Sequence, residues 1–523
     1  MAIPSLAMIP SGYKDGKVYS VLPTNGDGDF TFSRGSNATR VNKDGLIETM
    51  PLELGSEQVT NGGFDADSDW VKGTGWTISG GTASKSAGTQ SDLDQFSVTT
   101  SGSSYKVELT VSGVTAGSLS VRLGTGSGNE AGSINSNGIY EFYGVAGSDS
   151  RLRFRANTSF TGSIDNVSVK EVISGFDLPR LDYSDSSCPS LLLEPQSTNL
   201  VTYSEDFSQS YWTTSRIETP YIADVLSPDG TLNAYTLEIS SGETGGGGIF
   251  NPLTVTGDSS FSIFAKKNTV DYLALGDSGL NSSGYAVYFN LENGTVGTTY
   301  NATGEMQYFG NGWYRCTMKY TLTSSNNKFI YMTNIDGTTL NGVQGGDSIY
   351  IYGAQLEQGG YATSYIPTQG STVTRLSEEN NLSNINNLIG TTQGSWFLDW
   401  DIANSDTRDN ANIGFELSSD NNQNELNFSV GSDGNMRMFI RANDVYSLKH
   451  STINKSGKWC LVWNSTSLKL FQDGLQVYSD ADVLVYNNYT TYSMDANIQY
   501  KINNTQLFNT ALTDQKAIEL TLV

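Results

Sequence analysis

The 523-residue chain contains a single histidine, His450, and three cysteines that lie far apart at positions 188, 316 and 460. This leaves little material for a zinc site, for thiol chemistry or for a catalytic triad that depends on histidine. The odd number and wide spacing of the cysteines argue against a disulfide framework. No stretch approaches the ~20 consecutive apolar residues that cross a bilayer, so no membrane insertion is expected.

Charged residues are also scarce, at 16% of the chain, and the basic ones are scarcest. Thirty Lys and Arg oppose 54 Asp and Glu, which gives a formal net charge of −24. Such an acidic surface is a poor partner for phosphates, so nucleic-acid binding is not expected. The aromatic content of 11% is too high for a disordered acidic chain. A surface rich in neutral Ser, Thr, Asn, Gly and Tyr suits hydrogen bonding to sugars and stacking on them.

Short stretches that alternate between apolar and polar residues run through most of the chain. They are separated by Gly, Asn, Asp and Ser, and examples lie at 107–111, 119–123, 152–156, 261–265, 348–352 and 468–471. This pattern is typical of antiparallel β-sandwiches, or jelly rolls, and predicts an all-β fold. One short helix is predicted at 513–522, with Thr513 as its N-cap and Asp514 in its first turn.

An imperfect internal repeat divides the chain. A Thr-Asn segment leads to a Phe and then a Trp in both copies, through Thr60 to Trp70 and through Thr198 to Trp212. Each opening has a matching closing strand, at 164–171 and at 349–357. The repeat is domain-sized and predicts tandem β-sandwiches. The expected units are two sandwiches at 55–173 and 196–370, an Asn-rich linker at 371–390 and a third β unit at 391–523.

Residues 1–54 differ from the rest. They contain a strand, a turn and another strand between Phe30 and Ile47, which is too little to fold alone. We expect this region to pack on something else. Two short segments within 174–195, at 181–183 and 190–194, are expected to complete its sheet.

Three segments, at 28–47, 179–183 and 188–200, resemble virion fibre and receptor-binding proteins of tailed bacteriophages. Segment 55–173 is similar to jelly-roll carbohydrate-binding modules, and 196–370 resembles a divergent copy of such a module. The last unit, 391–523, resembles a concanavalin-A/laminin-G-type lectin domain, and its marks lie at 459–463, 468–474 and 507–514. Jelly-roll and lectin motifs specify a fold better than a ligand.

These resemblances imply a non-enzymatic virion appendage, such as a tail fibre, that is made in the host cytoplasm. Its N-terminal region would attach to other virion proteins, and its sandwiches would bind glycans of the host surface. The resemblance implies a homotrimer, and any multivalent fibre suits this function because many weak sugar contacts gain strength through repetition. One alternative is a head fibre or capsid-decoration protein that acts as a spacer. Another is a secreted polysaccharide-binding or glycan-degrading protein, which the absence of a typical signal peptide at residues 1–10 disfavours.

The carbohydrate-binding candidates are aromatic residues near the start of each sandwich. A pyranose ring has a flat apolar face that stacks on an exposed Trp or Tyr beside polar side chains. Trp70 and Trp76 meet this description in the first copy, and Tyr211 and Trp212 occupy the matching place in the second. The alternative is that these residues close the end of the sandwich as part of its core.

A structural calcium ion is implied by the resemblance to jelly-roll modules. Its ligands would be oxygens of Asn61 and Gly62 at the opening of the first sandwich and the carboxylate of Asp165 at its close, since calcium prefers oxygen ligands. Asp165 is equally suited to accept hydrogen bonds within a turn. In the second sandwich Tyr350 stands where Asp165 would be, so the calcium site is not expected there. No catalytic residues are predicted, because no nucleophile elbow or phosphate-binding loop occurs in the sequence.

Overall fold

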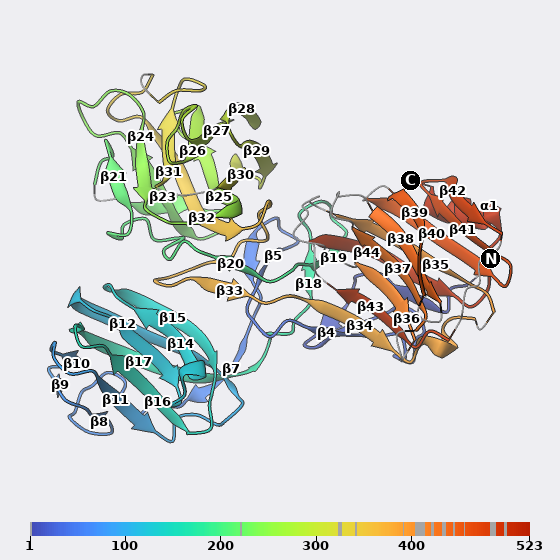
Figure 1. Cartoon of the computed structure of the whole chain (residues 1–523). Coiled ribbons are helices and arrows are strands. Elements are labelled where there is room, and N and C mark those ends of the chain that lie inside the picture. The colour runs from blue at the N-terminus through green and yellow to red at the C-terminus, as the bar shows by residue number, and fades with distance from the viewer. Residues whose placement is uncertain are drawn as a thin grey trace.

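The computed structural model describes twelve ranges of the chain. These are residues 3–219, 222–322, 327–339, 342–390, 392–402, 414–419, 423–430, 436–442, 445–453, 456–481, 488–495 and 499–522. Within them the regular secondary structure is almost entirely antiparallel β-strand, arranged as three β-sandwiches that form separate lobes in Figure 1. The predicted fold class, all-β with tandem antiparallel sandwiches, is confirmed.

The first sandwich packs a six-stranded sheet against a five-stranded sheet around its own hydrophobic core. The sheet orders are β15-β12-β17-β10-β9, with β7 also paired to β17, and β14-β13-β16-β11-β8. The elements are β7 (Glu53–Glu57), β8 (Val71–Lys72), β9 (Trp76–Ser79), β10 (Thr82–Lys85), β11 (Ser91–Phe96), β12 (Ser104–Ala116), β13 (Leu119–Leu123), the short 3₁₀ helix Ser127–Asn129, β14 (Glu130–Ile134), β15 (Gly138–Val145), β16 (Arg151–Ala156) and β17 (Thr161–Ser174). Leu152 and Phe154 of β16 enter the core, as the period of two requires.

The second sandwich consists of two six-stranded sheets around a separate core. The orders are β21-β24-β31-β26-β27-β28 and β22-β23-β32-β25-β30-β29. The strands are β21 (Thr213–Ser215), β22 (Ala223–Leu226), β23 (Leu232–Glu238), β24 (Gly247–Asn251), β25 (Gly257–Lys267), β26 (Tyr272–Asp277), β27 (Tyr285–Asn290), β28 (Thr295–Tyr300), β29 (Thr303–Tyr308), β30 (Trp313–Leu322), β31 (Lys328–Thr333) and β32 (Ser348–Gln358).

The third sandwich is assembled from three separate parts of the chain. An eight-stranded sheet has the order β18-β19-β44-β35-β40-β41-β42, with β1 also paired to β44, and a nine-stranded sheet has the order β2-β3-β4-β34-β43-β36-β37-β38-β39. The strands are β1 (Leu6–Met8), β2 (Tyr13–Lys14), β3 (Lys17–Val18), β4 (Phe30–Ser33), β18 (Arg180–Asp182), β19 (Ser190–Leu193), β34 (Glu379–Ser383), β35 (Gly394–Asp401), β36 (Phe415–Ser418), β37 (Glu425–Val430), β38 (Met436–Ala442), β39 (Val445–Ile453), β40 (Gly457–Asn464), β41 (Ser467–Gln472), β42 (Leu475–Asp480), β43 (Thr491–Asp495) and β44 (Tyr500–Phe508).

The N-terminal strands are therefore part of the third sandwich. Leu6 pairs with Leu507, and Phe32 pairs with Asn380, so the first residues complete both sheets. Leu6 and Phe32 are buried in the same core as Trp396. Residues 181–193 were expected to complete the sheet of the strands between Phe30 and Ile47. They instead join β1 in the eight-stranded sheet, through the C-terminal strand β44, whereas β4 lies in the nine-stranded sheet.

The segment 371–390, which was expected to be a linker, is folded and packed in the structure. This segment contains β33 (Val373–Arg375), which pairs with β20 (Ser197–Asn199), and β34, which lies in the middle of the nine-stranded sheet. It also contains a short 3₁₀ helix, Ile385–Asn387. The Asn-rich composition suggested a solvated connection, but Leu382 and Ile385 are buried in the third core. Tertiary packing has overridden the composition of the segment.

The helix predicted at the C-terminus is confirmed. The helix α1 (Asp514–Thr521) begins after Thr513, whose hydroxyl accepts a hydrogen bond from the backbone N–H of Lys516. Asp473 and Gly474 both have positive φ, at 48° and 80°, and they connect β41 to β42 as a tight hairpin turn. Within the described residues, no helix has both the length and the apolar character required to cross a bilayer.

Candidate functional site

The second and third sandwiches meet around a cluster of five charged side chains that are cut off from solvent. Arg180 forms ion pairs with Glu194 at 2.8 Å and with Glu378, and all three side chains are fully buried. Arg34 lies 3.0 Å from Glu378, and Arg375 lies 3.4 Å from Glu194. These residues come from the N-terminal region, from the segment between the first two sandwiches and from the segment after the second.

The arginines of this cluster hold its carboxylates in the charged form. Burial alone would raise the pKa of Glu194, but the charges of Arg375 and Arg180 and hydrogen bonds from Ser364 lower it to about 2. The pKa of Glu378 is lowered in the same way, against burial, mainly by Arg180. A buried ion cluster of this kind fixes the relative position of the segments that supply it, because separating any partner would leave an uncompensated charge.

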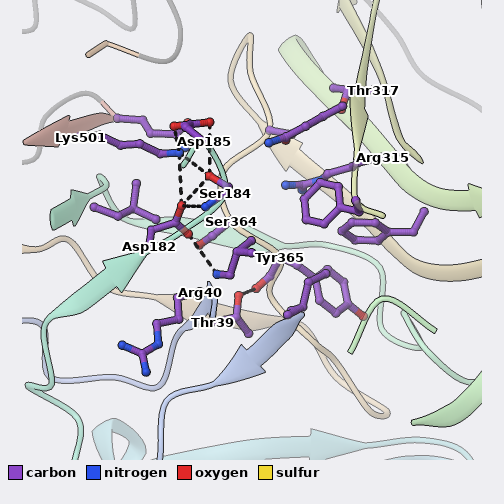
Figure 2. Close-up of a pocket in the computed structure, with 18 of the residues that line it drawn as sticks. Thr39, Arg40, Asp182, Ser184, Asp185, Arg315, Thr317, Ser364, Tyr365 and Lys501 are labelled. Atoms are coloured by element: carbon purple, nitrogen blue, oxygen red, sulfur yellow. Dashed lines mark hydrogen bonds and ion pairs between the residues drawn. The ribbon is translucent and has the colours of Figure 1, made fainter. Parts of the chain in front are cut away.

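A cavity of about 330 Å³ opens beside this cluster. It lies between the hairpin formed by β5 (Thr39–Val41) and β6 (Ile47–Thr49), the outer face of the second sandwich and the edge of the third. Figure 2 shows Lys501, Asp182 and Asp185 on one side of this junction pocket, and Arg315 and Thr317 on the other. Its volume is at the lower end of the roughly 300–1,000 Å³ that is usual for small-molecule sites.

The wall contributed by the third sandwich is a paired set of charges. Lys501 on β44 lies 3.2 Å from Asp182 and 2.5 Å from Asp185. Its amino group also donates to the hydroxyl of Ser184 at 2.5 Å, and that hydroxyl donates to Asp182. Burial would lower the pKa of Lys501, but the charges of Asp182 and Asp185 outweigh burial and raise it. Lys501 is therefore a cation at neutral pH, balanced by two carboxylates.

The opposite wall combines aromatic rings with a buried arginine. The rings of Phe309 and Tyr365 lie 5.0 and 5.8 Å from that of Phe264, both edge-on. The guanidinium of Arg315 lies 5.5 Å from the centre of the Phe264 ring, within the range of a cation–π interaction. Arg315 donates to the carbonyl of Thr363 at 2.7 Å and to the hydroxyl of Ser262 at 3.1 Å.

The alternation of β30 explains why Arg315 faces the pocket. Cys316 and Met318 point into the core of the second sandwich, so Arg315 and Thr317 lie on the outer face of the sheet. That face would meet solvent in an isolated sandwich. Here the β5–β6 hairpin covers it, since the N–H of Ile47 donates to the carbonyl of Pro228, and Arg315 is left 8% exposed. Burial lowers the pKa of Arg315, which the more distant charge of Glu357 opposes only in part.

The predicted sugar-binding aromatics do not line the junction pocket. Trp70, Trp76 and Trp212 are only 7%, 5% and 4% exposed. In both repeats the indole N–H of the tryptophan donates to a backbone carbonyl nine residues earlier, Trp70 to Asn61 at 3.1 Å and Trp212 to Tyr203 at 3.0 Å. The expectation that these tryptophans form exposed platforms is corrected, because their faces are covered by core side chains.

The packing of these aromatic residues explains the internal repeat of the sequence. Phe64 lies 5.2 Å from Trp70 and Phe207 lies 5.5 Å from Trp212, with the same interplanar angle of 41°. The repeated Phe and Trp thus form one end of each core. Tyr211 is half-buried and packs edge-on against Trp212. Sugar binding at Tyr211 stays a prediction.

The three calcium candidates fit the ion poorly. The carbonyl of Gly62 accepts the N–H of Val167 at 2.9 Å, and the carbonyl of Asn61 accepts the indole of Trp70. The side-chain amide of Asn61 donates to the carbonyl of Ala66. Calcium requires six to eight oxygen ligands, and Asp165 is the one carboxylate of the set. Within the described residues, no group of three or more His, Cys, Asp or Glu is placed to hold a metal ion.

Sequence reasoning missed the residues that form the pocket. Arg40 and Asp182 lie inside segments that resemble phage proteins. The resemblance drew attention to those segments but did not indicate what these two residues do. No motif or resemblance in the sequence pointed to Arg315, Tyr365 or Lys501. Polar residues that alternate with core residues in a strand predict a solvent-facing position, and nothing in the sequence indicates which segment covers them.

Comparison with known proteins adds two distant likenesses. No family model and no curated protein matches the chain. One similar solved structure is the Ruminococcus gnavus IT-sialidase CBM40, with 13% identity and a TM-score of 0.21, covering 25% of this chain and 84% of that one. Another is the N-terminal CBM22-1-CBM22-2 tandem domain of Paenibacillus barcinonensis Xyn10C, with 10% identity and a TM-score of 0.22, covering 59% and 99%. Both are carbohydrate-binding modules by name.

Proposed function

We propose that this chain is a non-enzymatic, glycan-binding fibre protein of a tailed-bacteriophage virion and that the junction pocket is its sugar site. The observation that carries the sugar part is the composition of the pocket walls. Phe309, which is partly exposed, supplies apolar ring surface that the buried rings of Phe264 and Tyr365 support, and the partly exposed Ser364 stands beside it as a hydrogen-bonding group. Sugars are recognised by this combination of apolar faces with a few placed polar groups.

The virion part of the proposal is supported by where the phage-like segments lie. Residues 28–47, 179–183 and 188–200 are far apart in sequence, but they supply Arg34, Arg180 and Glu194 to the buried ion cluster. They also supply Arg40 and Asp182 to the wall of the pocket. The resemblance therefore falls on the residues that build the junction, as expected if the joint serves the function.

Attachment to the particle is proposed for the N-terminal region. Its strands belong to the third sandwich, so it is not a separate arm, but several of its apolar side chains face outward. Ile3, Ile9, Tyr19 and Val21 are 78%, 42%, 38% and 48% exposed. Exposed apolar side chains of this kind are suited to contact another virion protein. Trimeric assembly and glycan binding by each sandwich remain part of the proposal.

Catalysis is not part of the proposed function. Both aspartates of the pocket wall are held by other side chains, since Asp182 and Asp185 pair with Lys501. A carboxylate that is balanced by an adjacent lysine is poorly suited to take a proton from a substrate. The pocket is therefore proposed to bind a sugar without breaking it.

The test is binding of the recombinant full chain to host cells and its ability to block phage adsorption. Ala362 lines the pocket and is half-buried, so Ala362→Trp would fill the cavity. Ala223→Trp on an exposed position of β22 is the matched control. The proposal expects A362W to lose cell binding and A223W to keep it. Equal binding by both variants would remove the pocket from the function.

A structural spacer on the phage head is the second candidate. The observation that favours it is the buried ion cluster, because five buried charges that join the second and third sandwiches suit a protein that only holds a shape. Electron microscopy of particles labelled in the third sandwich would separate the two. Label on the tail supports the receptor-binding fibre, and label on the capsid supports the spacer. Secretion of the chain as a free polysaccharide-binding or glycan-degrading protein would be contradicted by either location.

A further inference from the structure

Several arginines of this chain bind a carboxylate through the same edge of the guanidinium, which is formed by Nε and Nη2. Arg153 donates through Nε and Nη2 to the carboxylate of Asp94, at 2.8 and 2.7 Å. Arg155 binds Asp92 in the same way, at 2.9 and 3.0 Å. Arg180 does so in the buried cluster, with its Nε 2.7 Å from Glu378. The planar fork of arginine matches a carboxylate, and this bidentate contact is its strongest pairing.

Arg315 has the same planar guanidinium group, but no carboxylate is paired with it. Its Nη1 and Nη2 donate to the uncharged oxygens of Thr363 and Ser262, and its Nε has no hydrogen-bond partner. Across the described ranges, no Asp or Glu lies within ion-pair distance of Arg315, although the residue is only 8% exposed. Glu357, whose charge acts on it from further away, is held by Ser197 and Thr363. A buried cation without a partner is costly unless something neutralises it.

The other charges that line the pocket already have partners. Lys501 is balanced by Asp182 and Asp185, and Arg40 is bound by Glu48 at 2.6 Å. Glu305 forms an ion pair with Lys319 at 2.6 Å. Asp401 accepts the hydroxyl of Ser456. Arg315 thus differs from the other charged residues of the lining. It is the position at which an incoming anion would gain the most electrostatic attraction.

We propose that the junction pocket takes a carboxylate-bearing sugar, a uronic-acid residue of an acidic polysaccharide, with its carboxylate on Arg315. This inference rests on the proposed sugar site and names the class of its ligand. The ring of the sugar packs on the partly exposed Phe309, whose ring lies 5.0 Å from the buried ring of Phe264 that the guanidinium contacts. Its hydroxyl groups meet Ser364 and Thr317 on the same side of the cavity.

The chemistry of the two walls sets the orientation of this sugar. A carboxylate that faced Asp182 and Asp185 would be repelled, whereas on Arg315 it forms a charge-assisted hydrogen bond inside a cavity that screens it little. Figure 2 shows the guanidinium of Arg315 directed across the pocket toward the side of Ser184. The neutral hydroxyls of the sugar then face the aspartates, which accept hydrogen bonds from them.

The experiment compares glucuronic acid with glucuronamide, which has the same shape but no charge, by calorimetry on the full chain. The expected result is that glucuronic acid binds at least about tenfold more tightly, because one charge-assisted contact is worth about that factor. Acetate, which offers a carboxylate without a ring, should bind more weakly than glucuronic acid. In Arg315→Gln the preference for the acid over the amide should disappear.

A second variant keeps the test independent of whether R315Q folds. Asp185 is 56% exposed and lines the pocket. Asp185→Asn removes a like charge and leaves Lys501 partly unbalanced, so glucuronic acid should bind two- to threefold more tightly, as expected for one partly screened charge. Asp224→Asn on exposed β22 removes the same charge away from the pocket and should change nothing.

The outcomes separate this inference from the proposed function. Equal binding of the acid and the amide, both lost in A362W, would overturn the carboxylate but keep the sugar site. Acetate binding as tightly as glucuronic acid would overturn the sugar. Failure of all three probes to bind the wild-type chain would overturn the inference, and the cell-binding experiment with A362W would still decide the proposed function by itself.

Discussion

The same pair of residue types, arginine and carboxylate, occurs in two regions of this molecule with opposite surroundings. On the outer face of the five-stranded sheet, Arg151, Arg153 and Arg155 of β16 stand opposite Asp92 and Asp94 of β11. The side chains of this ladder are 9% to 28% exposed. In the junction cluster the corresponding values are 0% to 1%.

The difference teaches what each region does for the protein. Charges near solvent attract each other weakly, because water screens them and the long side chains lose freedom when they pair. Buried charges have lost their hydration, so each depends on its partner, and removing one leaves the other exposed to the full cost of burial. The more exposed pair of the ladder, Asp92 and Arg155, is therefore expected to contribute little to stability, whereas the junction cluster is expected to hold the second and third sandwiches in place.

Breaking the cluster should have the largest effect. Glu378→Gln removes one of two carboxylates that face three buried arginines, and we expect a loss of about 3–5 kcal/mol in the free energy of unfolding of the joint. The measurement is urea unfolding followed by tryptophan fluorescence. Glu379→Gln is the matched control, because Glu379 is the next residue in the chain but is exposed and outside the cluster. Equal midpoints for the two variants would show that the cluster is not the joint.

Lowering the pH should weaken the junction cluster without any substitution. The pKa of Glu194 is lowered from 4.5 to about 2, and that of Glu378 is lowered as well. Carboxylates with depressed pKa values stabilise the fold fully above their unfolded pKa, and this stability is lost as pH falls through the folded value. The joint should therefore weaken between about pH 4.5 and pH 2. Small-angle scattering should show an increase in the radius of gyration over this window, and a constant radius would contradict the prediction.

The sequence was sufficient for the strands but not for their partners. Alternation marked residues 119–123 and 152–156, and both are strands with alternate side chains in the core. Alternation does not say which strand lies next to which, because every half-buried strand shows the same period. The pairing of Leu6 with Leu507 joins the two ends of the chain, and no local pattern could predict it.

The candidate site depends on such long-range pairing throughout. Arg315 is a polar residue between core residues of β30, which by itself predicts exposure to solvent. It is buried by contacts with Thr363 and Phe264, and Ile47, which lies far away in the sequence, packs with Phe264 on the same face. The tryptophans failed as sugar platforms for the related reason that a core indole and an exposed one occupy the same kind of position in the sequence, and only the surrounding side chains distinguish Trp70 and Trp212.

A smaller effect is expected from the ladder. Asp92 and Arg155 are 24% and 28% exposed and form a bidentate pair. A double-mutant cycle with Asp92→Asn and Arg155→Gln should give a coupling energy of about 0.2–1 kcal/mol, and this coupling should shrink as salt is added. Thermal unfolding at low and high salt measures it. A coupling as large as the effect of E378Q would erase the distinction between the two regions.

The smallest effect concerns Asp165, a carboxylate of the first sandwich that belongs to neither region. It accepts the backbone N–H of Asn166 at 2.6 Å, and the carbonyl of Gly62 proposed beside it as a calcium ligand is bound to Val167. A ligand that binds only the folded state must raise the melting temperature. Because these oxygens already have protein donors, we expect excess chelator to leave the melting temperature unchanged. A fall that added calcium reverses, and that Asp165→Asn abolishes, would instead establish the calcium site and show that this lone carboxylate stabilises the first sandwich through a metal ion rather than an arginine.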